Sequence, residues 1–369
     1  MNIGILLPGF SSDEHDWAIP VQLNLVREMA RGDDVHVLAL RYPHRQDRYR
    51  VHGAEVISLG AGQVRGLRRL RLWWDALRTL RRLHREKPFD VLHAMWADET
   101  GLIAVWAGKW LGVPVVVSIA GGELAGFTDI GYGLQRSAFS RWIVERALRA
   151  DAVIPACSYT KRLIAQAGYR VPETRIRQIA LGVDTARFTP GEHPARGKTL
   201  IHAASLVGVK DQAILLQAFA RLDEDVSLVI VGEGPERGNL ETLAAGLGIT
   251  ERVQFVGAVH HLDMPDYYRN AALNVLTSHH EGLGMVTLEA AACGLPTVST
   301  AVGLLPDVPE MGVTVPVGDD AALAVAIQTL LNDEKRRTAL AQSAYATIQT
   351  RFTIQHTVAH FRAFYREIM

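Results

Sequence analysis

The chain has 369 residues, of which 48% are hydrophobic and 21% are charged, and its formal net charge is zero. This length exceeds what one domain usually needs, so two domains are expected. The composition excludes a disordered chain, and the balanced charge excludes a nucleic-acid-binding protein that acts through a global positive field.

The first half of the chain alternates short apolar runs with longer amphipathic segments, which indicates a parallel sheet with helices on both faces. The run Ile3–Leu7 begins two residues after Met1, without a basic segment or a cleavage site before it. A first strand is therefore expected rather than a signal peptide, which favours a cytoplasmic protein. No apolar run reaches the ~18 residues that span a bilayer. The strands predicted in this half are 3–7, 35–40, 91–93, 113–118 and 152–155.

Residues 64–87 are predicted to form an amphipathic basic helix. In one interpretation its apolar residues pack on the first sheet and its arginines face solvent. In the other, the helix makes weak peripheral contact with the inner face of the membrane, because arginine meets anionic lipid and tryptophan favours interfaces. The first interpretation is favoured. The predicted basic face is Arg68, Arg71, Arg78, Arg82 and Arg85, and the predicted apolar face is Leu70, Trp73, Trp74, Leu77 and Leu80.

The same alternation of strand and helix begins again after a polar stretch at 184–198, so a second doubly wound domain is expected. The boundary is placed near 176–190. Ligands bind beyond the carboxyl ends of the strands in such sheets, so candidate chemistry is sought in the strand-to-helix loops. The strands predicted in this half are 199–203, 227–231, 253–255, 273–277 and 297–300.

A glycine-containing turn follows the strand at 227–231. Gly232 and Gly234 fit the first two glycines of a dinucleotide-binding pattern, but Arg237 stands at the third position. A tight turn before a helix is therefore favoured over a phosphate cradle.

A stronger signal follows the strand at 273–277. Gly282 and Gly284 let the backbone approach a ligand, and a helix that starts near Met285 offers unpaired amide groups and a positive dipole end to a phosphate. Glu281 lies in the loop and Glu289 about one turn into the helix. Because a carboxylate accepts hydrogen bonds from vicinal hydroxyl groups, the two glutamates are expected to reach different parts of one sugar-containing ligand.

No metal site is predicted. Asp223 and Asp225 have a spacing that holds a divalent metal in some nucleotide sites, but they lie between a helix and a strand, at the wrong edge of the sheet. His279 and His280 lack a third ligand. The two cysteines, Cys157 and Cys293, each lie in an apolar run, as buried thiols do.

The chain contains Glu281, seven further residues, Glu289 and then Ala-x-x-x-Gly-Leu-Pro. This pattern resembles the family-4 glycosyltransferases, which are retaining enzymes of the GT-B fold. The resemblance covers nearly the whole chain. It implies two doubly wound Rossmann-like α/β domains that face each other across a cleft. The acceptor-side domain is expected at 1–178, the nucleotide-sugar donor domain at 179–352, and a helix that returns to the first domain at 353–369.

The resemblance also implies a role for each donor-site residue. Glu289 would hold the ribose hydroxyl groups, and Glu281 would contact the transferred sugar. The main chain of Val256 would contact the base. Lys210 would neutralise the departing diphosphate, whose charge grows in the transition state. The amides that would hold the sugar and diphosphate belong to Gly282, Leu283, Gly284 and Met285.

Three departures from the family pattern affect the expected site. Ser205 stands where the family commonly has an arginine beside the diphosphate, and Ala120 stands where it often has a histidine. The first loop, 9–17, is acidic and aromatic rather than glycine-rich. An unusual acceptor or a capped helix start at Ser12 or Asp13 would each account for that loop. The acceptor-side residues that the resemblance implies are Gly9, Asp16, His93, Gly121, Gly122 and Glu123.

The resemblance thus implies a retaining, metal-independent hexosyltransferase that needs no cofactor and uses a UDP- or GDP-sugar. The acceptor would be a glycan, a lipid-linked molecule or a small molecule, and no nucleic-acid partner is expected. Two alternatives stay open. One is a nucleotide-sugar epimerase or phosphorylase of the same fold. The other is a sugar-nucleotide-binding protein without turnover, which the absent arginine and histidine would suit.

Overall fold

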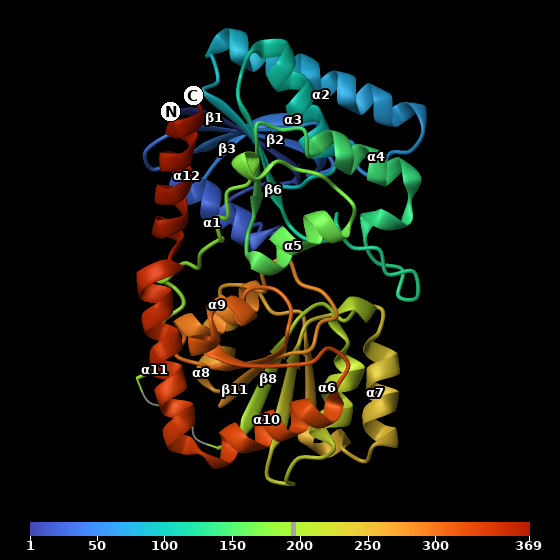
Figure 1. Cartoon of the computed structure of the whole chain (residues 1–369), viewed down its shortest axis with the longest axis vertical. Helices are drawn as coiled ribbons and strands as arrows, with labels where there is room; N and C mark the ends of the chain where they lie inside the picture. Colours follow the sequence, from blue (N-terminus) through green and yellow to red (C-terminus); the bar gives the residue numbers. More distant parts are fainter. Residues whose placement is uncertain (193–196) are drawn as a thin grey trace. The chain divides into compact units, whose positions relative to one another are not determined.

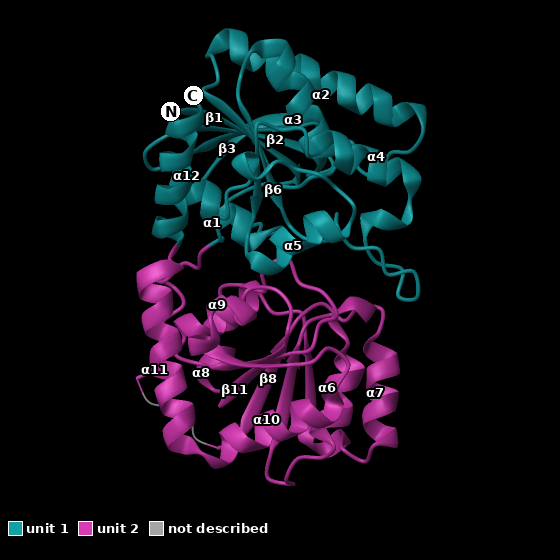
Figure 2. Cartoon of the chain, in the orientation of Figure 1, with its two compact units in different colours: residues 1–181, 354–369 teal, residues 182–353 magenta. Residues whose placement is uncertain are grey.

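A computed structural model describes residues 1–192 and 197–369, and the chain divides into two compact units. Unit 1 comprises residues 1–181 and 354–369, and unit 2 comprises residues 182–353 (Figure 2). Each unit is a sheet covered by helices, as Figure 1 shows. The doubly wound α/β architecture predicted for both halves of the chain is confirmed.

Unit 1 is built on a seven-stranded sheet of order β3-β4-β2-β1-β5-β6-β7. All neighbouring strands are parallel except β3 and β4, which are antiparallel. The strands are β1 (Asn2–Gly9), β2 (Asp34–Tyr42), β3 (Asp47–Val51), β4 (Ala54–Ser58), β5 (Val91–Ala94), β6 (Val115–Ile119) and β7 (Ala152–Pro155).

Alternate residues of the strands in unit 1 feed two separate cores, one on each face of the sheet. Leu6 and Leu38 belong to the core under α2, α3 and α4, whereas Ile5 and Val37 belong to the core under α1 and α12. Both faces of a parallel sheet must be covered, so continuous apolar strands were the correct signal. The helices of unit 1 are α1 (Pro20–Met29), α2 (Leu67–Glu86), α3 (Glu99–Leu111), α4 (Ala138–Ala147), α5 (Ser158–Gln166) and α12 (Ile354–Ile368).

The β3–β4 hairpin was not predicted from the sequence. His52 and Gly53 join its strands, and both have positive φ, at 47° and 84°. Two left-handed residues in succession give the turn that matches the twist of a tight hairpin. The histidine-glycine pair was therefore an available signal.

The expectation that a capped helix starts in the first loop, at Ser12 or Asp13, was wrong, because α1 begins at Pro20.

The predicted basic helix is α2, but its phase differs from the prediction. The buried residues include Trp73 and Leu80, as expected, whereas Leu70 is 54% exposed and Trp74 is 51% exposed. At 100° per residue, Leu70 and Trp74 share the outward face with Arg78 rather than the core face. The assignment of Leu70 and Trp74 to a packed apolar stripe was therefore wrong.

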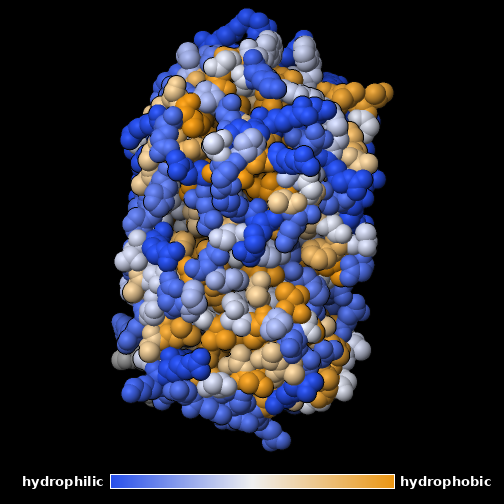
Figure 3. Space-filling view, viewed as in Figure 1, coloured by the Kyte–Doolittle hydropathy of each residue, from blue (hydrophilic) through white to orange (hydrophobic). Residues whose placement is uncertain are grey.

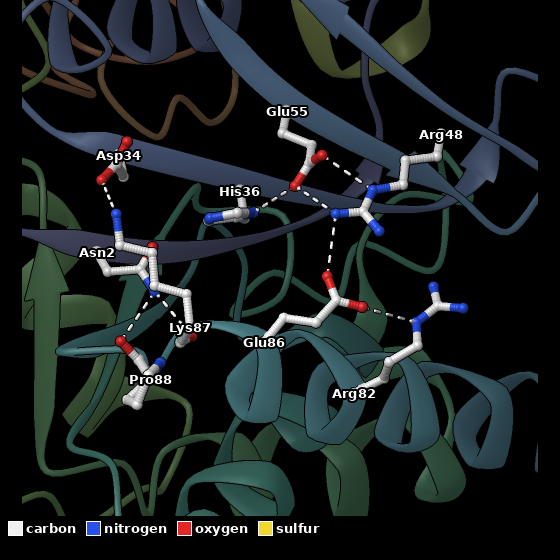
Figure 4. Close-up of polar contacts among 9 residues, drawn as sticks. All are labelled: Asn2, Asp34, His36, Arg48, Glu55, Arg82, Glu86, Lys87 and Pro88. Atoms are coloured by element: carbon white, nitrogen blue, oxygen red, sulfur yellow. Dashed lines mark hydrogen bonds and ion pairs between the residues drawn. The ribbon is translucent and has the colours of Figure 1, made fainter.

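The C-terminal end of α2 is fixed to the sheet by charged side chains, shown in Figure 4. Arg48 on β3 donates to Glu55 on β4 at 2.9 Å and to Glu86 at the end of α2 at 3.1 Å. Lys87, which follows the helix, pairs with Asp34 on β2. These contacts hold one end of α2 against the strands.

Unit 2 contains, among its described residues, a six-stranded parallel sheet of order β10-β9-β8-β11-β12-β13. Its strands are β8 (Thr199–Ala203), β9 (Ser227–Val231), β10 (Val253–Gly257), β11 (Leu273–Leu276), β12 (Thr297–Thr300) and β13 (Gly312–Val315). Its helices are α6 (Gln212–Phe219), α7 (Arg237–Gly246), α8 (Met264–Arg269), α9 (Met285–Ala292), α10 (Asp320–Asn332) and α11 (Glu334–Arg351).

His93 on β5 joins the sheet of unit 1 to α12. The side chain is fully buried, and its Nδ1 lies 2.6 Å from the hydroxyl of Tyr365 while its Nε2 lies 2.8 Å from the hydroxyl of Ser118. Its ring packs against Phe361 with 5.1 Å between centroids. Burial lowers the pKa of His93 to about 3, so the ring is neutral near pH 7.

This buried histidine predicts acid sensitivity of unit 1. The unfolded chain binds a proton at His93 below about pH 6.5 and the folded chain does not, so stability is lost as the pH falls from there toward 3. Between about pH 7.5 and about pH 5.5 the loss from this group is about 1.4 kcal/mol. His93→Gln should remove that part of the pH dependence.

Urea unfolding followed by tryptophan fluorescence measures this effect, because all seven tryptophans lie between Trp17 and Trp142, within unit 1. Equal pH dependence in the wild type and in His93→Gln would contradict the assignment.

Candidate functional site

The loop after β11 and the start of α9 hold the candidate donor-binding residues. Gly284 takes φ +87° immediately before the helix, and α9 begins at Met285, where the sequence predicted a helix start. No side chain of the described residues caps this helix end. The first amides of α9 therefore face the loop without a side-chain acceptor, as an anion site requires.

Glu281 is buried, with 8% of its surface exposed, and it is paired with Lys210. Lys210 Nζ lies 2.5 Å from Glu281 Oε1, and the hydroxyl of Ser278 donates to the same oxygen at 2.6 Å. The lysine and the glutamate come from different crossovers, after β8 and after β11. The structure thus brings together two residues that were selected separately, 71 positions apart.

Three further contacts hold the Lys210 loop against the Glu281 loop. The Thr277 hydroxyl donates to the carbonyl of Lys210 at 2.9 Å, and the His279 amide donates to the carbonyl of Val209 at 2.9 Å. His279 Nε2 also lies 3.1 Å from Asp211 Oδ2. Burial raises the pKa of Asp211, which also caps α6. These contacts hold the two loops together independently of the ion pair between Lys210 and Glu281.

Glu289 lies on α9 with two partners that the sequence analysis did not assign. Its Oε1 lies 3.0 Å from Nε2 of His261, and its Oε2 accepts from the hydroxyl of Tyr268 at 3.0 Å. Burial, with the nearby carboxylate, raises the pKa of Tyr268 well above its ordinary value, so the hydroxyl remains a donor. No local sequence signal marks this contact, because Tyr268 lies on α8, 21 positions before Glu289.

Ser205 and Val256 do not contact the Lys210–Glu281 pair through any hydrogen bond recorded for the described residues. Ser205 is exposed, and its carbonyl accepts from Nε2 of Gln212 at 3.0 Å. Val256 is half-buried and lies where the pairing of β10 with β9 shifts register. Both nonetheless lie at the carboxyl ends of their strands, on the edge of the sheet that carries Lys210 and Glu281.

The turn after β9 requires glycine for packing against a neighbouring backbone. A Cβ at Gly232, where φ is +141°, would lie 1.9 Å from the carbonyl oxygen of Ala204, and one at Gly234 would lie 2.2 Å from that of Leu206. The amide of Leu206 donates to the carbonyl of Glu233 at 2.9 Å. These contacts support the tight turn favoured from the sequence, because the protein backbone already occupies the space that each glycine leaves.

In unit 1, Gly9 and Asp16 both contact Tyr42. A Cβ on Gly9 would lie 2.9 Å from the Cβ of Tyr42, and the Tyr42 hydroxyl donates to Asp16 Oδ2 at 2.8 Å. The amide of Ser12 donates to the same oxygen at 2.7 Å. Asp16 is thus engaged in closing its own loop. His93 is separate from this group, because its two ring nitrogens serve Tyr365 and Ser118.

Gly121, Gly122 and Glu123 lie in the loop after β6. Glu123 is 2% exposed, and its Oε1 accepts from the amides of Ala97, at 3.2 Å, and Ala120, at 2.9 Å. Its Oε2 is buried without a hydrogen-bond partner among the described residues, and burial raises the pKa of the carboxyl group. Glu123 therefore joins the loops that follow β5 and β6, at the edge where acceptor contacts were expected.

No group of three or more histidine, cysteine or acidic side chains in the described part of the chain could hold a metal ion. Asp223 and Asp225, whose spacing suggested a metal, both pair with Lys198, at 3.8 and 2.9 Å.

Two family descriptions match the chain in sequence. Residues 19–182 match the Glycosyl transferase 4-like domain, and residues 185–347 match Glycosyl transferases group 1. The D-inositol 3-phosphate glycosyltransferase 1 of Catenulispora acidiphila is 30% identical over 294 residues, which are 69% of this chain and 67% of that protein.

A D-inositol 3-phosphate glycosyltransferase of Salinispora tropica is 34% identical over 207 residues, or 48% of this chain. The chain covers 43% of that relative, which is less than half of its length. Among solved structures, HepE of Anabaena in complex with UDP has the same fold, with a TM-score of 0.76, 19% identity and complete coverage of both chains.

The packing of the turn after β9 predicts that alanine substitutions at two glycines will change the stability of unit 2 by different amounts. Gly232→Ala should destabilise unit 2 by several kcal/mol, because the new methyl group would overlap a carbonyl oxygen and the backbone is left-handed. Gly238→Ala is the matched control, since it lies in the first turn of α7 with nothing within 4 Å. The control should be neutral or stabilising by up to about 1 kcal/mol. Thermal unfolding followed by circular dichroism compares them, and equal stability would contradict the packing argument.

Proposed function

The chain belongs to the family-4 glycosyltransferases of the GT-B fold, and we propose that it transfers a hexose from a nucleotide-diphosphate sugar with retention of configuration. The names of its relatives support sugar transfer. A neighbour of the same fold that binds UDP supports a nucleotide-sugar donor. The acceptor is proposed to bind unit 1 and the donor unit 2.

The observation that carries this proposal is the group formed by Lys210, Glu281, Glu289 and the uncapped start of α9. A nucleotide-diphosphate sugar presents an anionic diphosphate between two polyhydroxylated rings. The amides before and within the first turn of α9, with Lys210, supply positive groups for the diphosphate. Glu281 and Glu289 supply buried acceptors on either side for hydroxyl groups, with Glu289 proposed for ribose and Glu281 for the transferred sugar.

Lys210 and Glu281 form an ion pair with each other. In the proposed scheme the donor uses both charges. A diphosphate oxygen would take over Lys210, and a sugar hydroxyl would then donate to Glu281. The same lysine would stabilise the charge that develops on the departing diphosphate. No step of this scheme uses a metal.

For the acceptor we propose the loops after β1 and β6. Gly121 and Gly122 permit close approach, and Glu123, whose buried Oε2 has no hydrogen-bond partner among the described residues, joins the loops after β5 and β6. His93 is not included, because it is buried with both nitrogens engaged.

We also propose a cytoplasmic location at the inner face of the membrane. None of the described helices is both long and apolar enough to cross a bilayer.

Replacing each glutamate by glutamine should separate their roles. Glu289→Gln should weaken both the intact donor and the free nucleotide diphosphate by about one to two orders of magnitude, since a hydrogen bond to a charged acceptor contributes ~1.5 to 3 kcal/mol. Glu281→Gln should leave the affinity for the free nucleotide unchanged or higher, because Lys210 loses its partner. Its transfer rate should fall. Calorimetry with UDP and GDP, followed by transfer assays, gives both quantities.

Glu310→Gln is the matched control, because this carboxylate pairs with Arg351 at 2.9 Å outside the proposed site. Equal weakening of the nucleotide by the Glu281 and Glu289 variants would show that their roles are wrongly divided. Unchanged binding and transfer in both would show that this loop is not the donor site.

Lys210→Ala should lower the turnover number on the order of 10²-fold and weaken donor affinity much less, because its charge acts mainly on the leaving group. Lys198→Ala is the control, since Lys198 forms an ion pair with Asp225 away from the site.

Transfer by the wild type should persist in a chelator. Loss of activity on chelation that manganese or magnesium restores would refute the metal-independent scheme.

A further inference from the structure

The outward face of α2 carries large apolar side chains in its N-terminal half. Leu67 is 83% exposed, Leu70 is 54% exposed and Trp74 is 51% exposed, whereas the opposite face of the helix lies in the core. Hydrophobic and strongly hydrophilic residues lie side by side over α2 in Figure 3. The fold of unit 1 therefore buries one face of this helix and leaves apolar side chains at the start of the other face exposed to solvent.

Exposed aromatic residues of α3 and α4 extend this face. Trp110 at the end of α3 is 46% exposed, and Phe139 and Trp142 on α4 are 45% and 36% exposed. The ring of Phe139 is stacked between those of the buried Trp73 and Trp142, with centroid distances of 6.4 and 6.0 Å. An aromatic stack therefore runs from the core of unit 1 to its surface.

Each of these exposed rings has an arginine over its face. The guanidinium carbons lie 4.6 to 5.7 Å from the ring centroids. This arrangement keeps a cation at the level of each ring, as at the boundary between an apolar phase and anionic groups. The pairs are Arg78 with Trp74, Arg81 with Trp110, Arg69 with Phe139 and Arg146 with Trp142.

The C-terminal half of α2 is basic on the same outward side. Four arginines and Glu86 line a surface hollow of about 380 Å³. Glu86 is shared between Arg48, at 3.1 Å, and Arg82, at 3.9 Å, as Figure 4 shows, so the positive charges of Arg78, Arg81 and Arg85 are left without this carboxylate. The chain as a whole has no net charge, which makes this concentration of cations local. The arginines are Arg78, Arg81, Arg82 and Arg85.

We propose that the outward surface of α2, α3 and α4 is a docking surface for an anionic lipid bilayer. Leu67, Leu70, Trp74 and the α3 and α4 rings enter the interfacial layer, while Arg78, Arg81 and Arg85 contact lipid phosphates. The argument is charge complementarity combined with aromatic side chains, since a protein partner would not require a cation beside each ring. This proposal goes beyond the weak peripheral contact considered for α2, because it includes side chains of α3 and α4 and their insertion into the bilayer, and it does not depend on sugar transfer.

Co-sedimentation of the full chain with vesicles tests the proposal. Binding is expected to vesicles of phosphatidylglycerol and phosphatidylcholine and not to phosphatidylcholine alone. Part of it should persist at about 1 M salt, where the Debye length falls to ~3 Å, because inserted side chains are not screened. Brominated lipids should quench tryptophan fluorescence, which in this chain arises only from unit 1.

Two pairs of substitutions separate the apolar part from the charged part. Leu70→Ser with Trp74→Ser should lower vesicle binding on the order of tenfold and remove the salt-resistant fraction. Arg78→Gln and Arg85→Gln should each lower binding about fivefold at moderate salt and leave the insertion signal. Val325→Ser and Arg336→Gln, on exposed helical positions of unit 2, are the matched controls and should bind as the wild type does.

Three results would overturn the proposal. The first is no binding to anionic vesicles by a folded wild-type chain. The second is binding that high salt abolishes and that the Leu70 and Trp74 substitutions do not change, which would leave only a screened charge patch. The third is self-association, seen by sedimentation and abolished by the same substitutions, without vesicle binding. That result would identify the surface as a contact between copies of the chain.

Discussion

Parallel strands place every strand-to-helix loop at one edge of the sheet, and the candidate site in unit 2 depends on that constraint. Lys210 follows β8 and Glu281 follows β11, and these two strands are neighbours. Residues 71 positions apart are thereby brought within hydrogen-bond distance. The glycine turn after β9 packs against the loop after β8, so the same edge also sets the shape of the loop that carries Lys210.

Buried carboxylates at this edge are tolerated because each has partners before any ligand binds. Removing a carboxylate from water is costly unless donors replace the water, and Glu281 and Glu289 both have such donors. Sugar hydroxyl groups would therefore exchange one set of hydrogen bonds at these carboxylates for another and would leave neither carboxylate unpaired. This makes the site selective for ligands that bring hydroxyl groups, since an apolar ligand would break the existing contacts without replacing them.

The sequence predicted the parts of this arrangement that depend on local spacing. The helix start at Met285 and the positions of Glu281 and Glu289 follow from a glycine loop between a strand and a helix. The contacts of Glu289 with Tyr268 and His261 were not predictable, because they join segments 21 and 28 positions apart whose packing depends on the whole sheet. The same limit applies to His93, which the chain order placed near the edge and the return of α12 places in the core.

The wrong assignment of Leu70 and Trp74 to the buried face of α2 has a different cause. The helix is apolar on more than one side, so the sequence does not define which side faces the core. Adjacent residues on a helix differ by about 100°, so Trp73 and Trp74 cannot share a narrow stripe, and only the core decides which of them is buried. The side chain of Trp73 is held by Glu99, which accepts from its indole nitrogen at 3.2 Å. The hairpin β3–β4 was missed for another reason, since histidine adopts a positive φ less readily than glycine and the pair His52–Gly53 is a weaker turn signal than Asn-Gly.

The surface of unit 1 and its sheet edge are linked by hydrogen bonds, which bears on the choice of acceptor. Gln135, just before α4, donates to the carbonyl of Glu123 at 2.6 Å, and Glu99 at the start of α3 forms an ion pair with Arg69 and accepts from the indole nitrogen of Trp73 on α2. The helices with exposed aromatic rings are thus fixed to the loops proposed for the acceptor. A bilayer held by those helices would bring its headgroups to the same part of unit 1. Of the three acceptor classes, the proposed docking surface therefore favours a lipid-linked molecule, because the bilayer would hold such an acceptor beside unit 1.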